Sequence, residues 1–322
     1  MKKILIVSSN RLGDSILTSG VINYYKEKFK KSNITLICGP VPASLFKYYG
    51  EIDRLIITNK KKFSMHWIKV WIKTFSNFWD FVVDFRGTAL SLFLISKKRI
   101  NHVNKKNSHS VHMIDQISET MGEKRLSPKI SINENLLKQK KNLEVLREKK
   151  KKKKLVMIAP TANWIGKIWP IKRYAELIRK LSIKFNSDKP LFIIVAPSYE
   201  EHFTRTLFDL KNIDLFDLVG KTNLAEIFLI MKECSLFVGN DSGLMHLAAA
   251  SGVPTVGLFG PSNNIKYKPY GKKTMAISSP KSPEELMGGK DFNPKSCDSL
   301  MMDLTVEKVS SKIESFFKKN IK

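Results

Sequence analysis

Disulfide chemistry is one of several features that this sequence lacks. Its three cysteines, Cys38, Cys234 and Cys297, are widely spaced and fit neither a disulfide framework nor a zinc site. No stretch approaches the roughly 20 uncharged apolar residues of a membrane span. The apolar run near the N-terminus is too short for a signal peptide. We therefore expect a protein of the reducing cytoplasm.

Acidic residues are also scarce, because 29 Asp and Glu stand against 56 Lys and Arg, a net charge of +27. Such an excess is typical of proteins that bind nucleic acid or an anionic membrane. Only nine of the basic residues are Arg, the residue preferred for bidentate phosphate recognition. No zinc pattern, basic helix or RNA-binding aromatic motif accompanies the charge. We interpret it as compositional bias, expect no nucleic-acid partner, and expect weak electrostatic attraction to membranes.

The chain is long enough for two domains, with 322 residues of which 43% are hydrophobic. Short buried runs alternate with helical patterns in both halves, which favours parallel sheets covered by helices. The lysine run 149–154 marks the expected boundary, so that residues 1–150 and 151–322 form two α/β domains with a ligand cleft between them. The expected strands are residues 4–8, 34–38, 55–58, 81–85, 155–159, 191–196, 215–218, 236–238 and 255–259. The expected helices are residues 16–29, 63–79, 134–153, 171–185, 200–210, 224–234, 244–250 and 306–319.

The most informative stretch, residues 236–261, reads as strand, tight turn, helix and strand. Its turn lies at the carboxyl end of a strand, where parallel sheets bind ligands. The free N–H groups and the dipole of the following helix favour a phosphate there. Asp241, Ser242, Gly243 and His246 are therefore candidate ligands of a nucleotide or diphosphate. The pattern does not favour a Ser–His–Asp hydrolase, because the Gly-x-Ser-x-Gly elbow is absent and Asp241 adjoins Ser242.

Two further strand ends carry charged candidates. Asp14 follows Gly13 at the start of a helix, where it is either a charge that stabilises the helix or a general base. Lys167 follows the strand 155–159 and would neutralise the charge on a leaving phosphate. The Walker order of residues is missing there, and the alternative is an ordinary surface lysine. The residues alone leave both choices open.

The helix expected over residues 63–79 has an apolar stripe interrupted by lysines. Core packing is the default interpretation of such a stripe, and contact with a membrane surface is the alternative. His109 and His112 lack a further ligand that would complete a metal site, so we interpret them as polar residues on the acceptor side or as plain surface. The stripe consists of Phe63, Trp67, Val70, Trp71, Phe75 and Phe78, with Lys69 and Lys73 between them.

Taken together, these segments resemble the heptosyltransferases of glycosyltransferase family 9. The resemblance rests mainly on residues 11–17 and 240–261, with weaker support from 82–87, 160–170 and 297–309. It implies a GT-B fold of two Rossmann-like domains facing across a cleft. The first would bind the acceptor and the second the nucleotide sugar, with the last helix, about residues 306–319, packing back on the first domain.

The resemblance also implies a function: inverting transfer of a heptose from ADP-heptose to the lipopolysaccharide inner core. Asp14 would be the general base and Lys167 would assist the leaving phosphate, with no metal or other cofactor. The acceptor would be a glycolipid, so peripheral attachment to the inner face of the inner membrane is an option. By position, the donor-binding residues would be Thr161, Ala162, Glu201 or its neighbour Glu200, Thr222, Asp241, Ser242, Gly243 and His246. The acceptor-side candidates are Arg11, Gly13, Arg86, His109 and His112.

Two positions depart from the family pattern. Ala162 lacks a hydroxyl that several relatives carry, and Thr222 replaces a commonly apolar neighbour of the adenine. The alternatives are a GT-B transferase for another nucleotide sugar or cell-surface glycan, a non-catalytic sugar-nucleotide binding protein, and a basic adaptor for anionic surfaces. The sequence fixes neither the exact donor and acceptor nor the oligomeric state.

Overall fold

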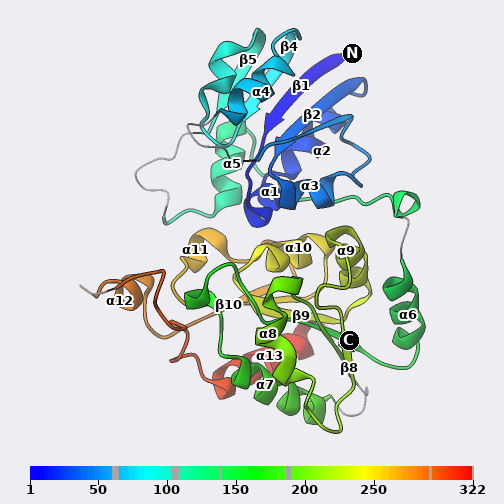
Figure 1. Cartoon of the computed structure of the whole chain (residues 1–322), viewed down its shortest axis with the longest axis vertical. Coiled ribbons are helices and arrows are strands. Elements are labelled where there is room, and N and C mark those ends of the chain that lie inside the picture. Colours follow the sequence, from blue (N-terminus) through cyan, green and yellow to red (C-terminus); the bar gives the residue numbers. More distant parts are fainter. Residues whose placement is uncertain (60–64, 103–108, 138–139, 186–189, 290–291, 321–322) are drawn as a thin grey trace. The chain divides into compact units, whose positions relative to one another are not determined.

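A computed structural model describes residues 1–59, 65–102, 109–137, 140–185, 190–289 and 292–320 (Figure 1). The chain divides into two compact units, Met1–Lys138 and Gln139–Lys322. Each unit is a parallel sheet with helices packed on it. No helix in the described part of the chain is both long and apolar enough to cross a membrane.

The sheet of the first unit has five parallel strands in the order β3-β2-β1-β4-β5. Residues 4–7 of the central strand β1 are buried, as expected for a strand covered on both faces. The strand order reverses between β1 and β4. The elements are β1 (Lys2–Val7), α1 (Leu12–Leu17), α2 (Gly20–Lys28), β2 (Ser32–Cys38), α3 (Pro40–Phe46), β3 (Arg54–Ile57), α4 (His66–Ile72), β4 (Trp79–Asp84), the 3-10 helix η2 (Ala89–Phe93), β5 (Ser96–Asn101), α5 (Met113–Met121) and η3 (Glu134–Leu136).

The second unit has six parallel strands in the order β11-β10-β9-β6-β7-β8, and its order reverses between β6 and β9. The elements are α6 (Lys141–Lys150), β6 (Leu155–Ala159), η4 (Ile165–Lys167), α7 (Ile171–Lys184), β7 (Leu191–Ile194), η6 (Ser198–Glu200), α8 (Glu201–Thr204), η7 (Arg205–Leu207), β8 (Leu215–Asp217), α9 (Leu224–Glu233), β9 (Leu236–Asn240), α10 (Gly243–Ser251), β10 (Thr255–Phe259), α11 (Asn264–Tyr267), β11 (Thr274–Ser278), α12 (Pro283–Met287) and α13 (Val306–Asn320).

Both terminal helices of the second unit pack inside that unit. In α6, the Arg147 guanidinium lies 3.0 Å from Glu233 on α9, so this helix belongs with the residues that follow the lysine run. In α13, Ile313 and Phe317 are part of the core of the second unit, and Phe317 stacks on Phe185 with ring centroids 4.2 Å apart. The expectation that the last helix also packs back on the first domain stays a prediction.

Several expected helices are shorter or divided. Residues 16–29 form parts of α1 and α2, because the chain turns at Thr18 and Ser19. Gly20 then runs close to another backbone, where a Cβ would lie only 2.4 Å from the Ser127 carbonyl oxygen. Residues 200–210 divide into η6, α8 and η7, and residues 134–153 into η3 and α6. Phe63, expected in the helix that contains α4, lies outside the described residues.

Candidate active site

The carboxyl edge of the second sheet is organised around one buried amide, that of Asn240. Because the strand order reverses between β6 and β9, the segments after these strands meet at this edge. Asn240 Oδ1 accepts from the Trp169 backbone N–H at 3.1 Å and from the Tyr174 hydroxyl at 2.9 Å. Its Nδ2 donates to the Pro160 carbonyl at 2.8 Å. One fully buried side chain therefore fixes both ends of the loop 160–170. Asn240 was not among the residues predicted from the sequence.

The same edge brings together Lys167 and Asp241, which were predicted separately. Lys167 Nζ lies 2.7 Å from Asp241 Oδ2. The Asp241 side chain is 8% exposed and the Lys167 side chain 28%. The Asp241 backbone N–H donates to the Leu258 carbonyl at 3.0 Å, which anchors the turn to β10. The pair thus presents a cation that solvent can reach, held by a carboxylate that is almost buried.

Ser242 begins α10 without capping it. Its hydroxyl oxygen is buried and has no hydrogen-bond partner within the described residues. The hydroxyl of Ser262, which follows β10, is also buried without a hydrogen-bond partner among the described residues. Ser262 was not predicted from the sequence. Buried polar atoms are usually hydrogen-bonded, so two such hydroxyls at one sheet edge favour a polar ligand there. Gly243 starts the helix, and the buried His246 lies one turn further along it.

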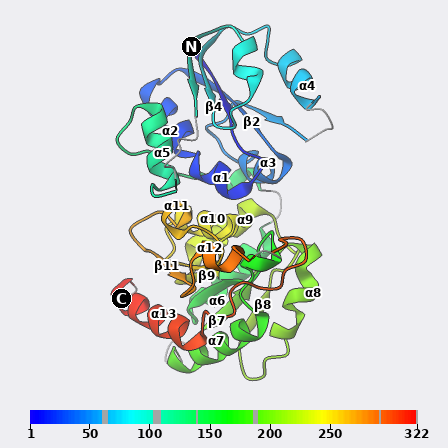
Figure 2. The same cartoon turned by 90° about the vertical axis from the view of Figure 1, so that its left-hand side faces the viewer.

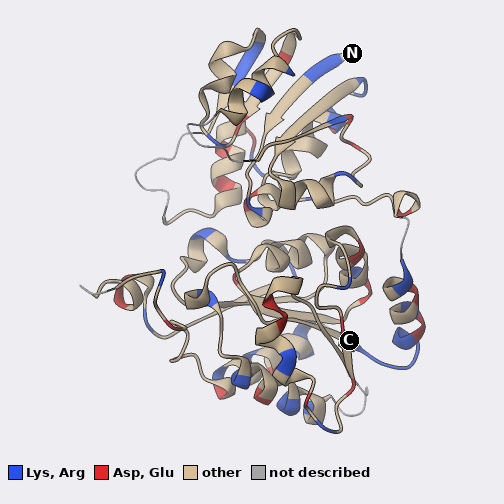
Figure 3. Ribbon diagram, viewed as in Figure 1, with Lys and Arg blue, Asp and Glu red and all other residues tan. Residues whose placement is uncertain are grey.

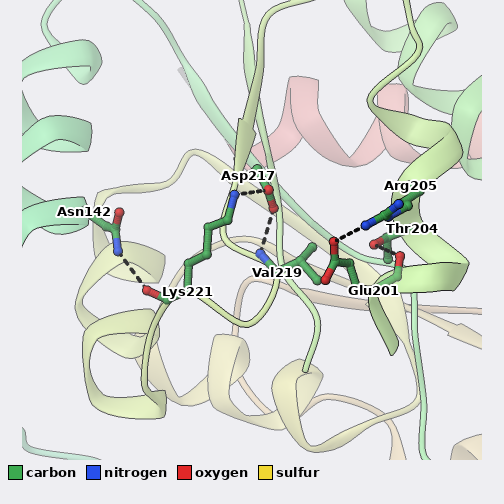
Figure 4. Close-up of polar contacts among 7 residues, drawn as sticks. All are labelled: Asn142, Glu201, Thr204, Arg205, Asp217, Val219 and Lys221. Carbon is green, nitrogen blue, oxygen red and sulfur yellow. Dashed lines mark hydrogen bonds and ion pairs between the residues drawn. The ribbon is translucent and has the colours of Figure 1, made fainter. Parts of the chain in front are cut away.

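Glu200 and Glu201 differ sharply in their surroundings. Glu200 follows β7 and is buried. Its carboxyl group forms a hydrogen bond with Thr161, the residue before the buried Ala162. Burial raises the pKa of Glu200, while the Thr161 hydrogen bond and the charge of His202 act against that rise. Glu201 is exposed and pairs with Arg205 at 3.2 Å (Figure 4). Of the two carboxylates that the sequence left open, only Glu200 faces the interior at a strand end.

The hydroxyl of Thr222 is engaged within the fold. It donates to Glu226 Oε2 at 2.6 Å, and Glu226 Oε1 accepts from the Leu143 N–H at 3.1 Å, which connects α9 to α6. Nearby, Asn142 donates to the Lys221 carbonyl at 3.2 Å, and Lys221 pairs with Asp217 (Figure 4). A contact of Thr222 with the adenine would therefore involve its backbone.

In the first unit, Asp14 lies in α1, directly after the central strand. It is partly exposed, and its Oδ2 accepts from the Ser9 hydroxyl at 3.2 Å. The backbone N–H of the exposed Arg11, the N-cap residue of α1, donates to the same hydroxyl at 3.1 Å. Gly13 occupies the first turn of this helix. Ser9 therefore positions the carboxylate relative to the turn before it.

Arg86 follows β4, whereas α1 follows β1, and the strand order reverses between these two strands. Its Nη1 donates to Asn10 Oδ1 at 3.1 Å, and its guanidinium stands 4.9 Å from the ring centroid of Trp67. Burial lowers the pKa of Arg86, and the charge of Asp84 opposes this. The first unit thus joins the turns after β1 and β4 through Arg86 and Asn10.

The two histidine candidates belong to the start of α5. The Nδ1 atom of the buried His112 accepts from the Ile114 N–H at 3.1 Å and so caps this helix. His109 is exposed in the turn before it. The geometry gives His112 a structural role.

Comparison with known proteins decides the family. The model for glycosyltransferase family 9 (heptosyltransferase) matches residues 68–293, well over half of the chain. The chain belongs to glycosyltransferase family 9. Lipooligosaccharide heptosyltransferase 2 of Campylobacter jejuni (serotype O:2) is 26% identical over 275 residues, which are 83% of this chain and 84% of the relative.

The fold of this glycosyltransferase is similar to that of solved structures. The glycosyl transferase family 9 structure from Veillonella parvula matches with a TM-score of 0.80 and 18% identity, covering 99% of this chain and 98% of that one. Escherichia coli heptosyltransferase WaaC with ADP matches with a TM-score of 0.68 and 16% identity, covering 98% and 99%. The predicted GT-B class, with two Rossmann-like parallel-sheet domains, is confirmed.

No group of three or more His, Cys, Asp and Glu in the described ranges of this glycosyltransferase could hold a metal ion. Among the charged groups at its strand ends are Lys167, Asp241 and Glu200 in the second unit, and Asp14 and Arg86 in the first.

Asn240→Ala should strongly destabilise the second unit of this glycosyltransferase. The substitution leaves three buried partners unsatisfied, so we expect a loss of about 3 to 5 kcal/mol in the free energy of unfolding, measured by urea denaturation. Asn142→Ala is the matched control, since it removes one exposed hydrogen bond and should cost about 0.5 kcal/mol or less. Equal losses in the two variants would contradict the organising role of Asn240.

Glu200→Gln should flatten the dependence of stability on pH. Because the pKa of Glu200 is raised in the folded protein, the folded state binds this proton more tightly than the unfolded state. Stability therefore falls as pH rises from the ordinary glutamate pKa of 4.5 through the higher folded value. The variant should have a higher Tm than the wild type at neutral pH. Thermal unfolding across a pH series tests this, with the exposed Glu201→Gln as control, and a lower Tm with an unchanged slope would refute it.

Proposed function

We propose that this glycosyltransferase moves a heptose from ADP-heptose to the inner core of lipopolysaccharide. The observation that carries the proposal is the Lys167–Asp241 pair at the strand reversal of the second sheet, in a chain of glycosyltransferase family 9. The names of the relatives support it: the Campylobacter jejuni relative is a lipooligosaccharide heptosyltransferase, and WaaC was solved with ADP.

The second unit would bind the donor through its carboxyl edge. Lys167, the N-terminus of α10 and the Ser242 hydroxyl suit a diphosphate, because all three favour negative charge or offer a donor. Asp241 would repel a phosphate, so its proposed task is to hold Lys167 and to accept hydrogen bonds from sugar hydroxyls. His246 would contact the same group from one turn inside the helix.

The nucleoside would lie along the ends of β6 and β7. Glu200 suits the ribose, since a buried carboxylate accepts hydrogen bonds from two neighbouring hydroxyls. Thr161 and Ala162 would meet the phosphates, and the backbone at Thr222 would meet the adenine. Glu201 is set aside as a donor ligand, because it is exposed and paired with Arg205.

The first unit would supply the base and the acceptor contacts. The reaction would be a single displacement. Asp14 takes the proton of the acceptor hydroxyl while the oxygen of that hydroxyl forms a bond to the anomeric carbon. The bond from that carbon to the phosphate oxygen breaks, and its electron pair leaves with ADP, beside Lys167. Arg11 and Arg86 suit anionic groups of the acceptor, and Gly13 allows its close approach. Because the acceptor is a glycolipid, we place the reaction at the cytoplasmic face of the inner membrane, with peripheral attachment of the protein.

The donor assignment is tested by nucleotide binding. ADP and ADP-heptose should raise Tm, and GDP, UDP and their sugar conjugates should raise it far less. Lys167→Ala should weaken ADP binding about tenfold to a hundredfold, measured by calorimetry well below the Tm of the variant. Lys172→Ala, which removes an exposed lysine five residues further on, should bind ADP normally. A UDP-selective shift, or no shift with any nucleotide, would remove ADP-heptose as the donor.

The base assignment is tested by Asp14→Asn. This variant should lower kcat for heptose transfer to a Kdo-bearing lipid A acceptor by about 100-fold to 10,000-fold, the usual contribution of a general base. Its affinity for ADP-heptose should stay unchanged, because donor binding is assigned to the other unit. Asp115→Asn is the matched control, since Asp115 is also an acidic residue in the first turn of a helix. Near-normal turnover by Asp14→Asn would leave Asp14 with only a helix-stabilising role.

A further inference from the structure

Exposed apolar side chains are concentrated on one part of the first unit, formed by α4, η2 and the turns beside them. Figure 2 shows α4 on the outside of the sheet of this unit. Of the nineteen large apolar residues that are exposed in the described chain, nine belong to residues 65–95. We call these nine residues the α4–η2 patch. They are Met65, Ile68, Trp71, Ile72, Phe75, Phe78, Leu92, Phe93 and Ile95, each between 37% and 70% exposed.

The two parts of the patch adjoin each other at Trp71. Its indole N–H donates to the Phe93 carbonyl at 2.9 Å, and its ring stacks on Phe75 with centroids 4.7 Å apart. Along the chain, Met65, Ile68, Ile72 and Phe75 follow at helical spacings of three and four, which gives one stripe.

The opposite sides of the same two elements form part of the core. Val70 of α4 and Leu90 of η2 are buried in a cluster with residues of the sheet, such as Leu5 and Val82. The inner face of α4 is therefore already satisfied, and the exposed stripe is a second apolar face. An exposed apolar surface of this extent on a folded unit marks an interaction site.

The patch is bordered by positive charge. Lys69, Lys73, Lys97 and Lys98 are all exposed, and Figure 3 shows the basic residues on α4 and β5. Lys97 Nζ lies 5.8 Å from the ring centroid of Phe78 and 3.7 Å from Asp80 Oδ1. The acidic residues of this segment are already engaged. Asp80 accepts from Lys2 Nζ and from the Lys3 N–H, both at 3.0 Å, and the Asp84 oxygens accept from the turn that follows it.

We propose that the α4–η2 patch docks this protein on an anionic lipid bilayer. Tryptophan and phenylalanine side chains enter the region between headgroups and acyl chains, and lysines at the border contact anionic headgroups. The combination of exposed aromatic and aliphatic groups with lysines matches this partner, since an apolar protein interface has no need of a cationic border. The docking surface deepens the peripheral attachment in the proposed function, on which it rests, and lipid binding can be measured without donor or acceptor.

Vesicle co-sedimentation tests the proposal. The full-length protein should bind vesicles of phosphatidylglycerol mixed with phosphatidylcholine, and should bind pure phosphatidylcholine much more weakly. Ile68→Ser/Phe93→Ser keeps the net charge and should lower the partition coefficient by about tenfold or more. Leu136→Ser/Ile183→Ser is the matched control: it changes two equally exposed apolar residues outside the patch and should bind like the wild type.

A second pair of variants separates local charge from total charge. Lys69→Gln/Lys73→Gln should weaken binding to the anionic vesicles more than Lys149→Gln/Lys152→Gln, although both remove two positive charges. Unchanged stabilisation by ADP shows that each variant is folded, and it reports on the proposed function separately. Equal vesicle binding by the wild type and Ile68→Ser/Phe93→Ser would overturn the proposal. So would a wild-type dimer that this variant dissociates while neither protein binds vesicles, since the patch would then join two copies of the chain.

Discussion

The reversal of strand order in each parallel sheet is the constraint on which the candidate site depends. All strands of a parallel sheet end at one edge, but adjacent crossover connections leave in the same direction until the order reverses, and the edge is open only there. The reversal lies between β1 and β4 in the first unit and between β6 and β9 in the second. The charged residues proposed to act in binding or catalysis follow these four strands: they are Asp14, Arg86, Lys167 and Asp241. Within each unit, sheet topology, rather than any single motif, therefore determines which distant residues lie at the same edge.

Within the second unit, polar groups divide into those that hold the site and those that remain available. Asn240 has three hydrogen bonds with Pro160, Trp169 and Tyr174 and no exposed surface, so its role is structural. The hydroxyls of Ser242 and Ser262 are buried without partners among the described residues, which is costly unless a ligand completes them. Lys167 has both properties, because Asp241 holds its ammonium group in place while solvent still reaches it. A cation held in this way needs little reorganisation to meet a phosphate.

Elements with a local sequence pattern were the ones best predicted. The strand–turn–helix–strand of residues 236–261 appears as β9, α10 and β10, because buried runs and glycine-flanked turns are local signals. The strands β5 and β11 were not predicted, and both lie at the edge of a sheet. The residues of β5, Ser-Lys-Lys-Arg-Ile-Asn, are largely exposed and show no apolar alternation. Nor could the sequence decide between Glu200 and Glu201, since burial of one neighbour and exposure of the other depends on how η6 joins α8. Asn240 and Ser262 were missed for the same reason, as their significance comes from partners far along the chain.

The net charge of +27 and the α4–η2 patch act at different ranges. Charge of one sign attracts the protein to any anionic surface, but salt screens this attraction over about 8 Å at physiological ionic strength, and it does not select an orientation. An apolar patch acts only in contact, and it selects one face of the molecule. Compositional bias would account for the total charge but not for the patch, since random lysines do not gather nine exposed apolar side chains on two adjoining elements. A glycosyltransferase whose acceptor is embedded in lipid gains most from this second kind of attraction, because it fixes which side of the first unit meets the membrane.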